Sequence, residues 1–394
     1  MGSEPGNGWN WSIGIAKRGY NVHVITISKG QKNIEKALAN MANSNLNIQF
    51  HYIDHSRFWA KAYYWNFTTM YIAYWLWQKK IFTFSKKKFK KGEIDFIHHV
   101  TWGSLKIGSK LNQLKVPMLF GPVGGGQKTP LQFKTYLGKD YLSEKLRNVL
   151  GEFILRNNPL SKGVLKNCQM LVTNTDTLDV VSKYCKKTPK LIFDAAIKTT
   201  NIPAITVRDQ NQLNLIWVGR INGFKGLSLI ITALSLINKE HLKSIHLEIV
   251  GDGPDRKHIE YLIQKFHLQK NISLTGMIPY EEVQKHYEKN NTFIYTSLRD
   301  SFPSQILEAQ LWSLPVITLN LHGQSLMVDE SIGIKCSVDE PNKTLQEISE
   351  GILFMLQQPI KRQEMGENAQ KKAMQQTWDK KIDTVVDEFY PMNL

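Results

Sequence analysis

The chain has 394 residues, of which 42% are hydrophobic and 21% are charged; this composition excludes a disordered chain, and the length favours two domains over one. Lys and Arg outnumber Asp and Glu by 50 to 34, so the net charge of +16 favours polyanionic partners, meaning nucleic acid, an anionic membrane or phosphorylated substrates. The three cysteines lie far apart without a Cys-x-x-Cys pair, which indicates neither a disulfide framework nor a zinc site and suits a reducing cytoplasm.

The amino terminus is polar and rich in glycine, so it lacks the apolar core of a signal peptide. Gly6, Asn7 and Gly8 predict a phosphate-loop-like turn. A helix over 9–18 and a strand over 20–26 are expected to follow. Loops of this kind normally come after a strand in an α/β sheet. We therefore expect the natural reading frame to start upstream, with an apolar strand of about six residues.

Aromatic and basic residues dominate 57–91, after a strand predicted over 47–53. Five aromatic side chains fall at helical spacing, and seven lysines follow between Lys79 and Lys91. This pattern favours an interfacial contact with an anionic membrane; the alternative is a buried helix with a solvated lysine face. Nothing else in the chain resembles a nucleic-acid module, so no nucleic-acid partner is expected. The uncharged stretch over 63–78 is shorter than the ~20 residues that a membrane span needs.

Two strand ends in the first half carry candidate ligand contacts. One strand ends in His98 and His99, each of which is either a contact to a substrate hydroxyl or phosphate or a structural residue. The strand over 117–120 is followed by three consecutive glycines, among them Gly124 and Gly125. Successive glycines indicate a close backbone approach or positive φ, which predicts a ligand-facing loop at a domain cleft or, alternatively, a plain tight turn. Helices over 136–156 and 176–186, strands over 169–173 and 190–193, and a linker over 199–207 complete this half.

The second half repeats the α/β pattern more regularly. A buried strand over 213–218 leads into a loop in which Arg220 and Lys225 are placed to converge on one phosphate-bearing ligand. A strand over 246–250 ends in a glycine turn that contains Gly253. Strand ends that carry glycine, a cation or a carboxylate are typical of a nucleotide cleft. No Gly-x-Gly-x-x-Gly fingerprint with a downstream acid is present, which disfavours a dehydrogenase.

The most informative stretch runs from Asp300 to Glu308, two carboxylates on a turn that leads from a strand into a helix. In α/β sheets this edge is where ligands bind. With Pro303 at the first helical position, the amides of Ser304 and Gln305 are predicted to face an anion such as a diphosphate. Glu308 can then accept hydrogen bonds from one sugar and Asp300 can reach a second; the alternative is two solvated carboxylates. A strand over 315–319 and closing helices over 342–357, 361–376 and 379–390 follow.

Four motifs of the second half resemble those of glycosyltransferase family 4, whose members are retaining enzymes of the GT-B architecture. They are Val218-Gly-Arg-x4-Lys225-Gly, Gly251-Asp-Gly-Pro-x-Arg256, Asp300-x7-Glu308-Ala and Leu314-Pro-Val-Ile. The first half is similar to a bacterial surface-polysaccharide subgroup. The motifs that carry this similarity are Gly-Ser-Glu-Pro-Gly-x-Gly-Trp-x-Trp at Gly2, His-His-Val-Thr at His98 and Gly-Pro-Val-Gly-Gly-Gly at Gly121.

The resemblance implies an α/β fold of the GT-B type, in which two Rossmann-like domains face each other across a cleft and the first strand of the amino-terminal domain is missing. We expect an acceptor-side domain over 1–205, a nucleotide-sugar donor domain over 206–376 and a helix over 377–394 that crosses back. The implied activity moves a hexose from a nucleoside-diphosphate sugar to a glycan or lipid-linked saccharide in surface polysaccharide synthesis. The resemblance further implies no metal or other cofactor, and a cytoplasmic protein, peripheral on the inner face of the membrane through 57–91.

The resemblance also implies roles for individual residues. The donor diphosphate and nucleoside would be bound by Arg220, Lys225, Gly253, Ser304, Gln305 and Glu308; the sugar or acceptor would be met by Asp300, His98 and His99; the glycine loops would supply Gly6, Asn7, Gly8, Gly124 and Gly125. The family usually has Glu where this chain has Asp300, which is one methylene shorter. That difference and the missing strand leave two alternatives, a non-catalytic nucleotide- or membrane-binding remnant and, less favoured, another enzyme on the same architecture such as an epimerase or a phosphorylase.

Overall fold

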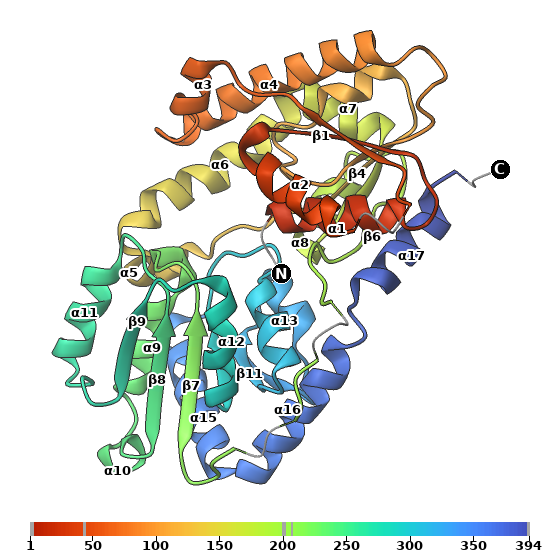
Figure 1. Ribbon diagram of the computed structural model, residues 1–394. Helices are drawn as coiled ribbons and strands as arrows, with labels where there is room; N and C mark the ends of the chain where they lie inside the picture. The colour runs from red at the N-terminus through yellow and green to blue at the C-terminus, as the bar shows by residue number, and fades with distance from the viewer. Residues whose placement is uncertain (1–3, 42–44, 199–201, 206–207, 392–394) are drawn as a thin grey trace.

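The computed structural model describes residues 4–41, 45–198, 202–205 and 208–391. Figure 1 shows two α/β domains, and every strand pair in the described residues is parallel. The predicted fold class, α/β with two parallel-sheet domains, is therefore confirmed. Within these residues no helix has the length and apolar character that a bilayer span requires.

The carboxy-terminal domain is built on a six-stranded sheet in the order β12-β11-β10-β7-β8-β9. Its strands are β7 (Leu213–Val218), β8 (Ile245–Val250), β9 (Ile272–Gly276), β10 (Thr292–Tyr295), β11 (Val316–Leu319) and β12 (Gly333–Cys336). All residues of β10 and β11 are buried, as expected of parallel strands that helices cover on both faces. The sheet grows from β7 in two directions, through β8 and β9 on one side and through β10 on the other, so its topological switch point lies between β7 and β10.

Helices of this domain alternate with the strands along the chain. They are η6 (Gly223–Lys225), α9 (Leu227–Leu234), α10 (Lys239–Leu242), α11 (Arg256–Lys265), α12 (Tyr280–Lys289), α13 (Ser304–Leu311), α14 (His322–Met327), α15 (Pro341–Gln357) and α16 (Pro359–Ala373). The α9 helix is the most deeply embedded, because seven of its eight residues are buried against the sheet and α15. The core of this domain also includes Phe133 and Leu137, which come from the first half of the chain.

The sheet of the amino-terminal domain is in two pieces in the described residues. One piece is the pair β1 (Val22–Thr26) and β2 (Ile48–Tyr52), and the other has the order β3 (Ile97–His99), β4 (Met118–Val123), β5 (Gln169–Val172) and β6 (Lys190–Leu191). Only β4 is buried at every residue, whereas every residue of β1 and β3 is half-buried. Both β1 and β3 are edge strands, because each pairs on one side only within the described chain.

Helices surround these two sheets. They are α1 (Glu4–Ala16), η1 (Ser28–Gly30), α2 (Gln31–Ala39), α3 (Arg57–Ala62), α4 (Phe67–Lys88), η3 (Lys110–Leu114), α6 (Tyr141–Asn157), α7 (Pro159–Asn167) and α8 (Thr175–Ser182). The short helices η4 (Leu131–Phe133), α5 (Lys134–Leu137) and η5 (Gly138–Asp140) belong to the same half of the chain but pack against the carboxy-terminal domain. Figure 1 shows α6 on the outside of the molecule, where it runs from the lower domain to the upper one.

The glycine-rich turn predicted at the amino terminus is wrong for its described part, because the chain is helical from Glu4 onward. Pro5 is compatible with this helix, since it lies in the first turn, where backbone N–H groups have no intrahelical acceptor. The helix is held by tertiary packing: Trp11 and Ile15 join Trp378 and Ile382 of α17 (Trp378–Phe389) in one apolar cluster. This burial outweighs the low helix propensity of the glycines.

Candidate functional site

The loops that follow β7 and β10 flank the switch point of the carboxy-terminal sheet, which is where α/β sheets bind ligands. The first loop carries Lys225 and the second carries Asp300. Gly226 lets the first loop turn into α9, because its φ of +68° is in the left-handed region and a Cβ there would clash with the carbonyl oxygen of Thr296. The fold therefore brings the two loops into direct contact.

Lys225, Tyr295 and Asp300 form a hydrogen-bonded cluster at this contact. The Lys225 ammonium donates to Tyr295 Oη at 2.6 Å and pairs with Asp300 Oδ2, and Tyr295 Oη donates to the same carboxylate oxygen at 2.6 Å. Burial acts to raise the pKa of Asp300, but the Lys225 charge and these hydrogen bonds outweigh it and hold the pKa below its usual value. The cluster thus places an ionised carboxylate and a cation side by side.

Arg220 and Gly253 lie on the same edge of the sheet, after β7 and β8 respectively. The Arg220 side chain is exposed, and no ion pair joins it to another described residue. Gly253 packs tightly against the backbone of Ile221, so a Cβ at this position would clash with that carbonyl group. The glycine therefore lets the β7 and β8 loops pack closely. Arg220, which precedes Ile221 in the chain, remains available to a ligand.

Glu308 is buried inside α13 and does not contact the Lys225 cluster. Its two carboxylate oxygens accept hydrogen bonds from Tyr280 Oη at 3.1 Å and from Tyr287 Oη at 3.3 Å. Burial raises the pKa of Glu308, and the two tyrosine hydrogen bonds partly oppose this. Ser304 and Gln305 open the helix, with Pro303 as its N-cap and not, as predicted, its first residue.

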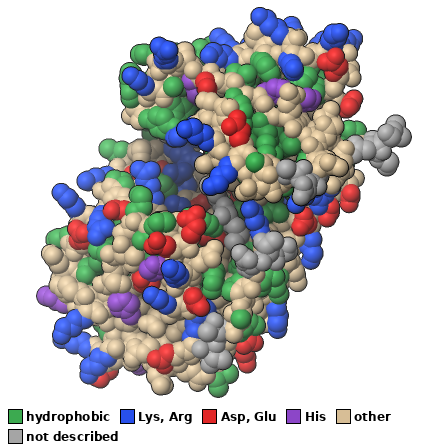
Figure 2. Space-filling model, in the orientation of Figure 1, with side chains coloured by type: hydrophobic (Ala, Val, Ile, Leu, Met, Phe, Trp, Pro, Cys, Tyr) green, Lys and Arg blue, Asp and Glu red, His purple; other side chains and the backbone are tan. Residues whose placement is uncertain are grey.

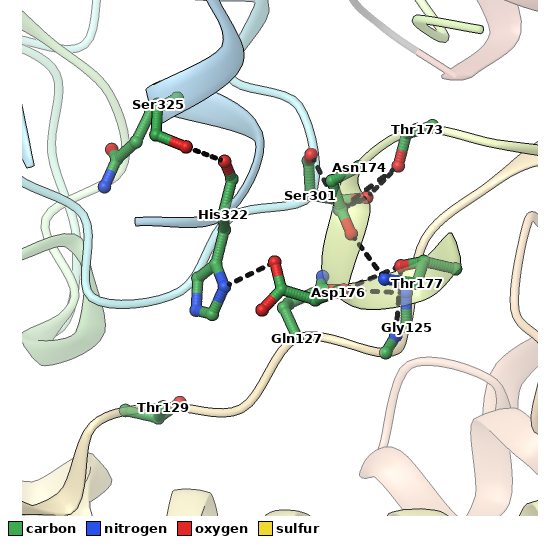
Figure 3. A network of polar contacts seen from close by, with 12 residues as sticks. Gly125, Gln127, Thr129, Thr173, Asn174, Asp176, Thr177, Ser301, His322 and Ser325 are labelled. Atoms are coloured by element: carbon green, nitrogen blue, oxygen red, sulfur yellow. Dashed lines mark hydrogen bonds and ion pairs between the residues drawn. The ribbon is translucent and has the colours of Figure 1, made fainter. Parts of the chain in front are cut away.

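The glycine loop of the amino-terminal domain meets the Asp300 loop, as Figure 3 shows for the surrounding network. Ser301 Oγ lies 2.6 Å from Thr173 Oγ1, and Asn174 Nδ2 donates to the Ser301 carbonyl at 3.0 Å. Gly124 is so close to Ser301 that a Cβ at Gly124 would clash with its hydroxyl. The close approach predicted for these glycines is thus to the residue next to Asp300.

Gly125 and its neighbours hold the same loop in shape. Gly125 has a φ of +124° and donates its N–H to Gln127 Oε1 at 2.8 Å. A second cross-domain contact lies beside this network, where His322 Nδ1 is 3.0 Å from Asp176 Oδ2 (Figure 3). These contacts fix the two domains against each other beside the Lys225 cluster.

His98 and His99 point into the amino-terminal domain. His98 Nδ1 lies 2.7 Å from Tyr390 Oη and its Nε2 lies 2.8 Å from the Gly121 carbonyl oxygen, so both ring nitrogens have partners inside the protein. His99 Nε2 lies 3.3 Å from Tyr74 Oη. Burial lowers the pKa of His98 to about 3 and that of His99 to about 4, so both are neutral at physiological pH.

The predicted phosphate loop at Gly6, Asn7 and Gly8 forms part of α1 and packs against the segment after β3. Glu4, at the start of this helix, accepts a hydrogen bond from the Trp102 N–H. Asn7 is buried, and its Oδ1 has no hydrogen-bond partner among the described residues. An orphaned buried acceptor of this kind is an available contact for a ligand that donates a hydrogen bond.

Asp194 is a carboxylate near the site that sequence reasoning did not identify. Phe193 packs against Phe302 of the Asp300 loop with ring centroids 4.7 Å apart and ring planes tilted by 32°, which brings Asp194 to the domain interface. Burial raises the pKa of Asp194 to about 7, although the charge of Lys381 on α17 opposes the shift. A single Asp after a short strand gives no sequence pattern, so nothing in the chain pointed to it.

A group of cations lies at the same interface around one carboxylate. Arg299 Nε is 2.7 Å from Glu144 Oε2, which joins the loop before Asp300 to α6, and Arg147 of the same helix is 3.8 Å from that oxygen. Burial, together with these two arginine charges, lowers the pKa of Lys106 to about 8. Figure 2 shows basic side chains on the wall of a recess between the two halves of the molecule, where an anionic ligand would be attracted. The described residues contain no group of three or more His, Cys, Asp and Glu side chains arranged to hold a metal ion.

Comparison with known proteins matches residues 198–372 to the family described as glycosyl transferases group 1. The GPI3 subunit of phosphatidylinositol N-acetylglucosaminyltransferase from Saccharomyces cerevisiae is 24% identical in an alignment of 184 positions that covers 42% of this chain and 40% of that protein. The 2-deoxystreptamine N-acetyl-D-glucosaminyltransferase of Niallia circulans is 26% identical over 140 residues, or 33% of this chain and 36% of that enzyme. The chain thus spans about two-fifths of the length of each of these two relatives.

Solved structures match over nearly the whole chain. Anabaena Alr3699/HepE in complex with UDP has a TM-score of 0.63 at 15% identity and covers 98% of this chain and 96% of its own. WaaG, a glycosyltransferase involved in lipopolysaccharide biosynthesis, has a TM-score of 0.61 at 14% identity, with coverage of 100% and 97%. At these identities the likeness concerns the fold. Residues 198–372 therefore match the glycosyl transferases group 1 family, in a chain that has the two-domain GT-B fold.

Proposed function

We propose that this protein is a glycosyltransferase that moves a hexose from a nucleoside-diphosphate sugar to a glycan or lipid-linked saccharide with retention of anomeric configuration. The observation that carries the proposal is the Lys225–Tyr295–Asp300 cluster at the switch point of a glycosyl transferases group 1 domain. A cation and a carboxylate are thereby held together at the sheet edge where a nucleotide would bind.

Leaving-group stabilisation is the chemistry that these residues can supply. When the bond between sugar and diphosphate breaks, negative charge develops on the diphosphate, and preorganised cations lower the energy of that state. Arg220, exposed on the same loop as Lys225, would share this role, and neither residue would need a metal ion or another cofactor to do so. Asp300 would sit beside the donor sugar ring.

The remaining predicted residues have supporting positions in this scheme. Glu308, held by Tyr280 and Tyr287, would accept hydrogen bonds from ribose hydroxyls, and the amides of Ser304 and Gln305 would contact phosphate. Gly124 and Gly125 would bring the acceptor-side domain close to the sugar, and Asn7 Oδ1 offers a free acceptor. His98 and His99 would act by shaping the site, since His98 uses both ring nitrogens inside the protein.

A surface-polysaccharide acceptor at the inner face of a bacterial membrane fits the region 57–91. Phe58, Tyr64 and Trp65 are exposed around α3, and Lys29 donates to Tyr64 Oη at 2.9 Å. Tyr74 of α4 is internal, because it stacks on Trp102 with centroids 3.9 Å apart, whereas Trp75 of the same helix is 42% exposed. The proposed membrane contact therefore uses the α3 end of the region and only one face of α4.

Nucleoside diphosphate release from a panel of nucleotide sugars tests the proposal. Arg220→Ala and Lys225→Ala should each lower turnover by at least about a hundredfold, as for lost charge stabilisation in other enzymes. Lys243→Ala is the matched control, since its ion pair with Glu240 is exposed on the surface. Turnover in the wild type with unchanged turnover in both site variants would contradict the assignment.

A second candidate is a non-catalytic protein that binds nucleotide or membrane without transfer. The observation in its favour is the divided amino-terminal sheet, which leaves β1 and β3 as half-buried edge strands. This candidate would be favoured if nucleoside diphosphates bind in a thermal-shift assay but no nucleoside diphosphate is released from any nucleotide sugar.

A further inference from the structure

The helix α6 is amphipathic, but its apolar face is exposed and its polar face is turned to the protein. A surface helix normally turns its apolar face to the core, yet the outer face of α6 carries apolar side chains that are 39% to 74% exposed. They are Leu142, Leu146, Val149, Leu150, Phe153 and Ile154. The inner face is polar: Glu144 accepts a hydrogen bond from Thr129 Oγ1 at 2.5 Å, and Asn148 Nδ2 donates to the Thr129 carbonyl at 2.8 Å.

The exposed side chains form one continuous stripe. Positions 142, 146, 149, 150 and 153 follow the i, i+4, i+7, i+8, i+11 spacing of a single helix face, within an arc of about 100°. The inner face is fixed in place by Glu144, which also pairs with Arg299 of the other domain. The helix therefore cannot turn its apolar face inward without breaking these polar contacts. Exposed apolar surface of this kind marks an interaction site.

We propose that the outer stripe of α6 docks on an anionic lipid bilayer. The aromatic patch at Phe58, Tyr64 and Trp65 supports a membrane, because Trp and Tyr favour the membrane–water interface. Figure 1 shows α3 and α6 on the same flank of the molecule. Tyr71, at the start of α4, interacts electrostatically with Arg147 of α6, which requires the two helices to be near each other.

Charge and area favour lipid over a second copy of the chain. Lys145 flanks the stripe, Lys29 sits at Tyr64, and the net charge is +16, which is complementary to an anionic surface. The stripe spans about 18 Å of helix, and its six side chains, 39% to 74% exposed, offer on the order of 500 Å². A stable protein interface needs about 800 Å² from each partner, whereas partial immersion of one helix face is enough for interfacial binding.

The bilayer contact bears on the substrate if the proposed transferase activity is correct. The inner face of α6 borders the basic recess, since a Cβ at Gly151 would lie 3.0 Å from Lys106 Nζ. A helix that rests on the membrane by one face and lines this recess by the other would admit an acceptor from the lipid side. The acceptor class that this favours is a lipid-linked saccharide.

Co-sedimentation with vesicles tests the docking and needs no sugar transfer. The docking proposal can therefore fail while the proposed function stands, and the proposed function can fail while the docking proposal stands. The full chain should sediment with vesicles of phosphatidylglycerol and phosphatidylcholine in equal parts, and less with phosphatidylcholine alone. Leu146→Gln/Val149→Gln/Phe153→Gln should weaken the binding at least about tenfold, because three apolar side chains leave the interface while helix propensity is kept.

The matched control is Leu236→Gln/Met277→Gln/Ile360→Gln, which changes three exposed apolar residues of the carboxy-terminal domain. This variant should bind vesicles like the wild type, and both triple variants should keep the wild-type melting temperature. Wild-type protein that stays in the supernatant, or an α6 variant that sediments as well as the wild type, overturns the proposal. A wild-type dimer in light scattering that becomes monomeric only in the α6 variant also overturns it, in favour of a second copy.

Discussion

Replacing Lys225 by Met should destabilise the protein by about 2–4 kcal/mol at neutral pH. Lys225 and Asp300 are each 16% exposed at the side chain, so removal of the cation leaves a carboxylate nearly buried without its charge partner. Breaking a buried pair in this way costs about 3–5 kcal/mol. Tyr295 still donates to Asp300, and a hydrogen bond of this type offsets about 1 kcal/mol.

The same change predicts a pH dependence whose sign follows from Asp300. The pKa of this carboxylate is lower in the folded protein than its usual value, so its ionised form contributes stability above the unfolded pKa, and this contribution is lost as the pH falls. Lys225→Met removes the largest lowering influence. The difference between wild type and variant should therefore be full at neutral pH and shrink in acid.

Urea denaturation followed by tryptophan fluorescence measures the effect, with Trp217 in the core of the same domain. Lys243→Met is the control, because its pair with Glu240 is 70% and 79% exposed and such pairs contribute at most about 1 kcal/mol. The double variant Lys225→Met/Asp300→Asn should recover part of the loss, since the unpaired charge is gone. The reasoning would be refuted if Lys225→Met lowered the unfolding free energy no more than Lys243→Met does. It would also be refuted if the double variant lost more unfolding free energy than the two single variants together.

Two further perturbations test the interface. Gly124→Ala should push Ser301 away and separate the domains, which small-angle scattering would show as a larger radius of gyration. Gly30→Ala is the control and should leave the radius unchanged, because a Cβ there meets only the tip of one side chain. An equal radius of gyration for the two variants would count against the packing described. Asp194→Asn should alter stability with pH. Because burial raises the pKa of Asp194 to about 7, its contribution is present in acid and is lost as the pH rises from about 4 to about 7. The unfolding free energy of the variant should thus rise relative to wild type over that window, and a constant difference would contradict the assigned burial.

The carboxy-terminal domain was largely predictable because local pattern and tertiary role agree there. Its strands are mainly apolar, and β10 and β11 are buried at every residue, as expected of covered parallel strands, which bring all their carboxyl ends to one edge. Lys225 and Asp300, 75 positions apart, could for that reason be expected at one site and are in contact. Glu308, although only eight positions from Asp300, is turned toward Tyr280 and Tyr287, a direction that spacing does not determine.

The amino-terminal half depended on contacts that no local pattern contains. Gly6 to Gly8 are helical because α1 packs against α17, where Arg18 Nε donates to Asp383 at 2.6 Å across 365 positions. The helix over 136–156 was expected, but an apolar stripe by itself predicts a face turned to the core. Only the position of Glu144 between Thr129 and Arg299 shows that the stripe of α6 faces outward.

The hydrogen bonds that hold Ser301 against the opposite domain have a consequence for the proposed reaction. Ser301 is bound by Thr173 and Asn174 of the opposite domain, and it follows Asp300 directly in the chain. If the domains part, these bonds are among the first to break, and the peptide that positions the carboxylate is released with them. In an open molecule Asp300 would not be in position beside the donor sugar. The bond between sugar and diphosphate would therefore not be activated, and water would not cleave it, until an acceptor binds and the domains close.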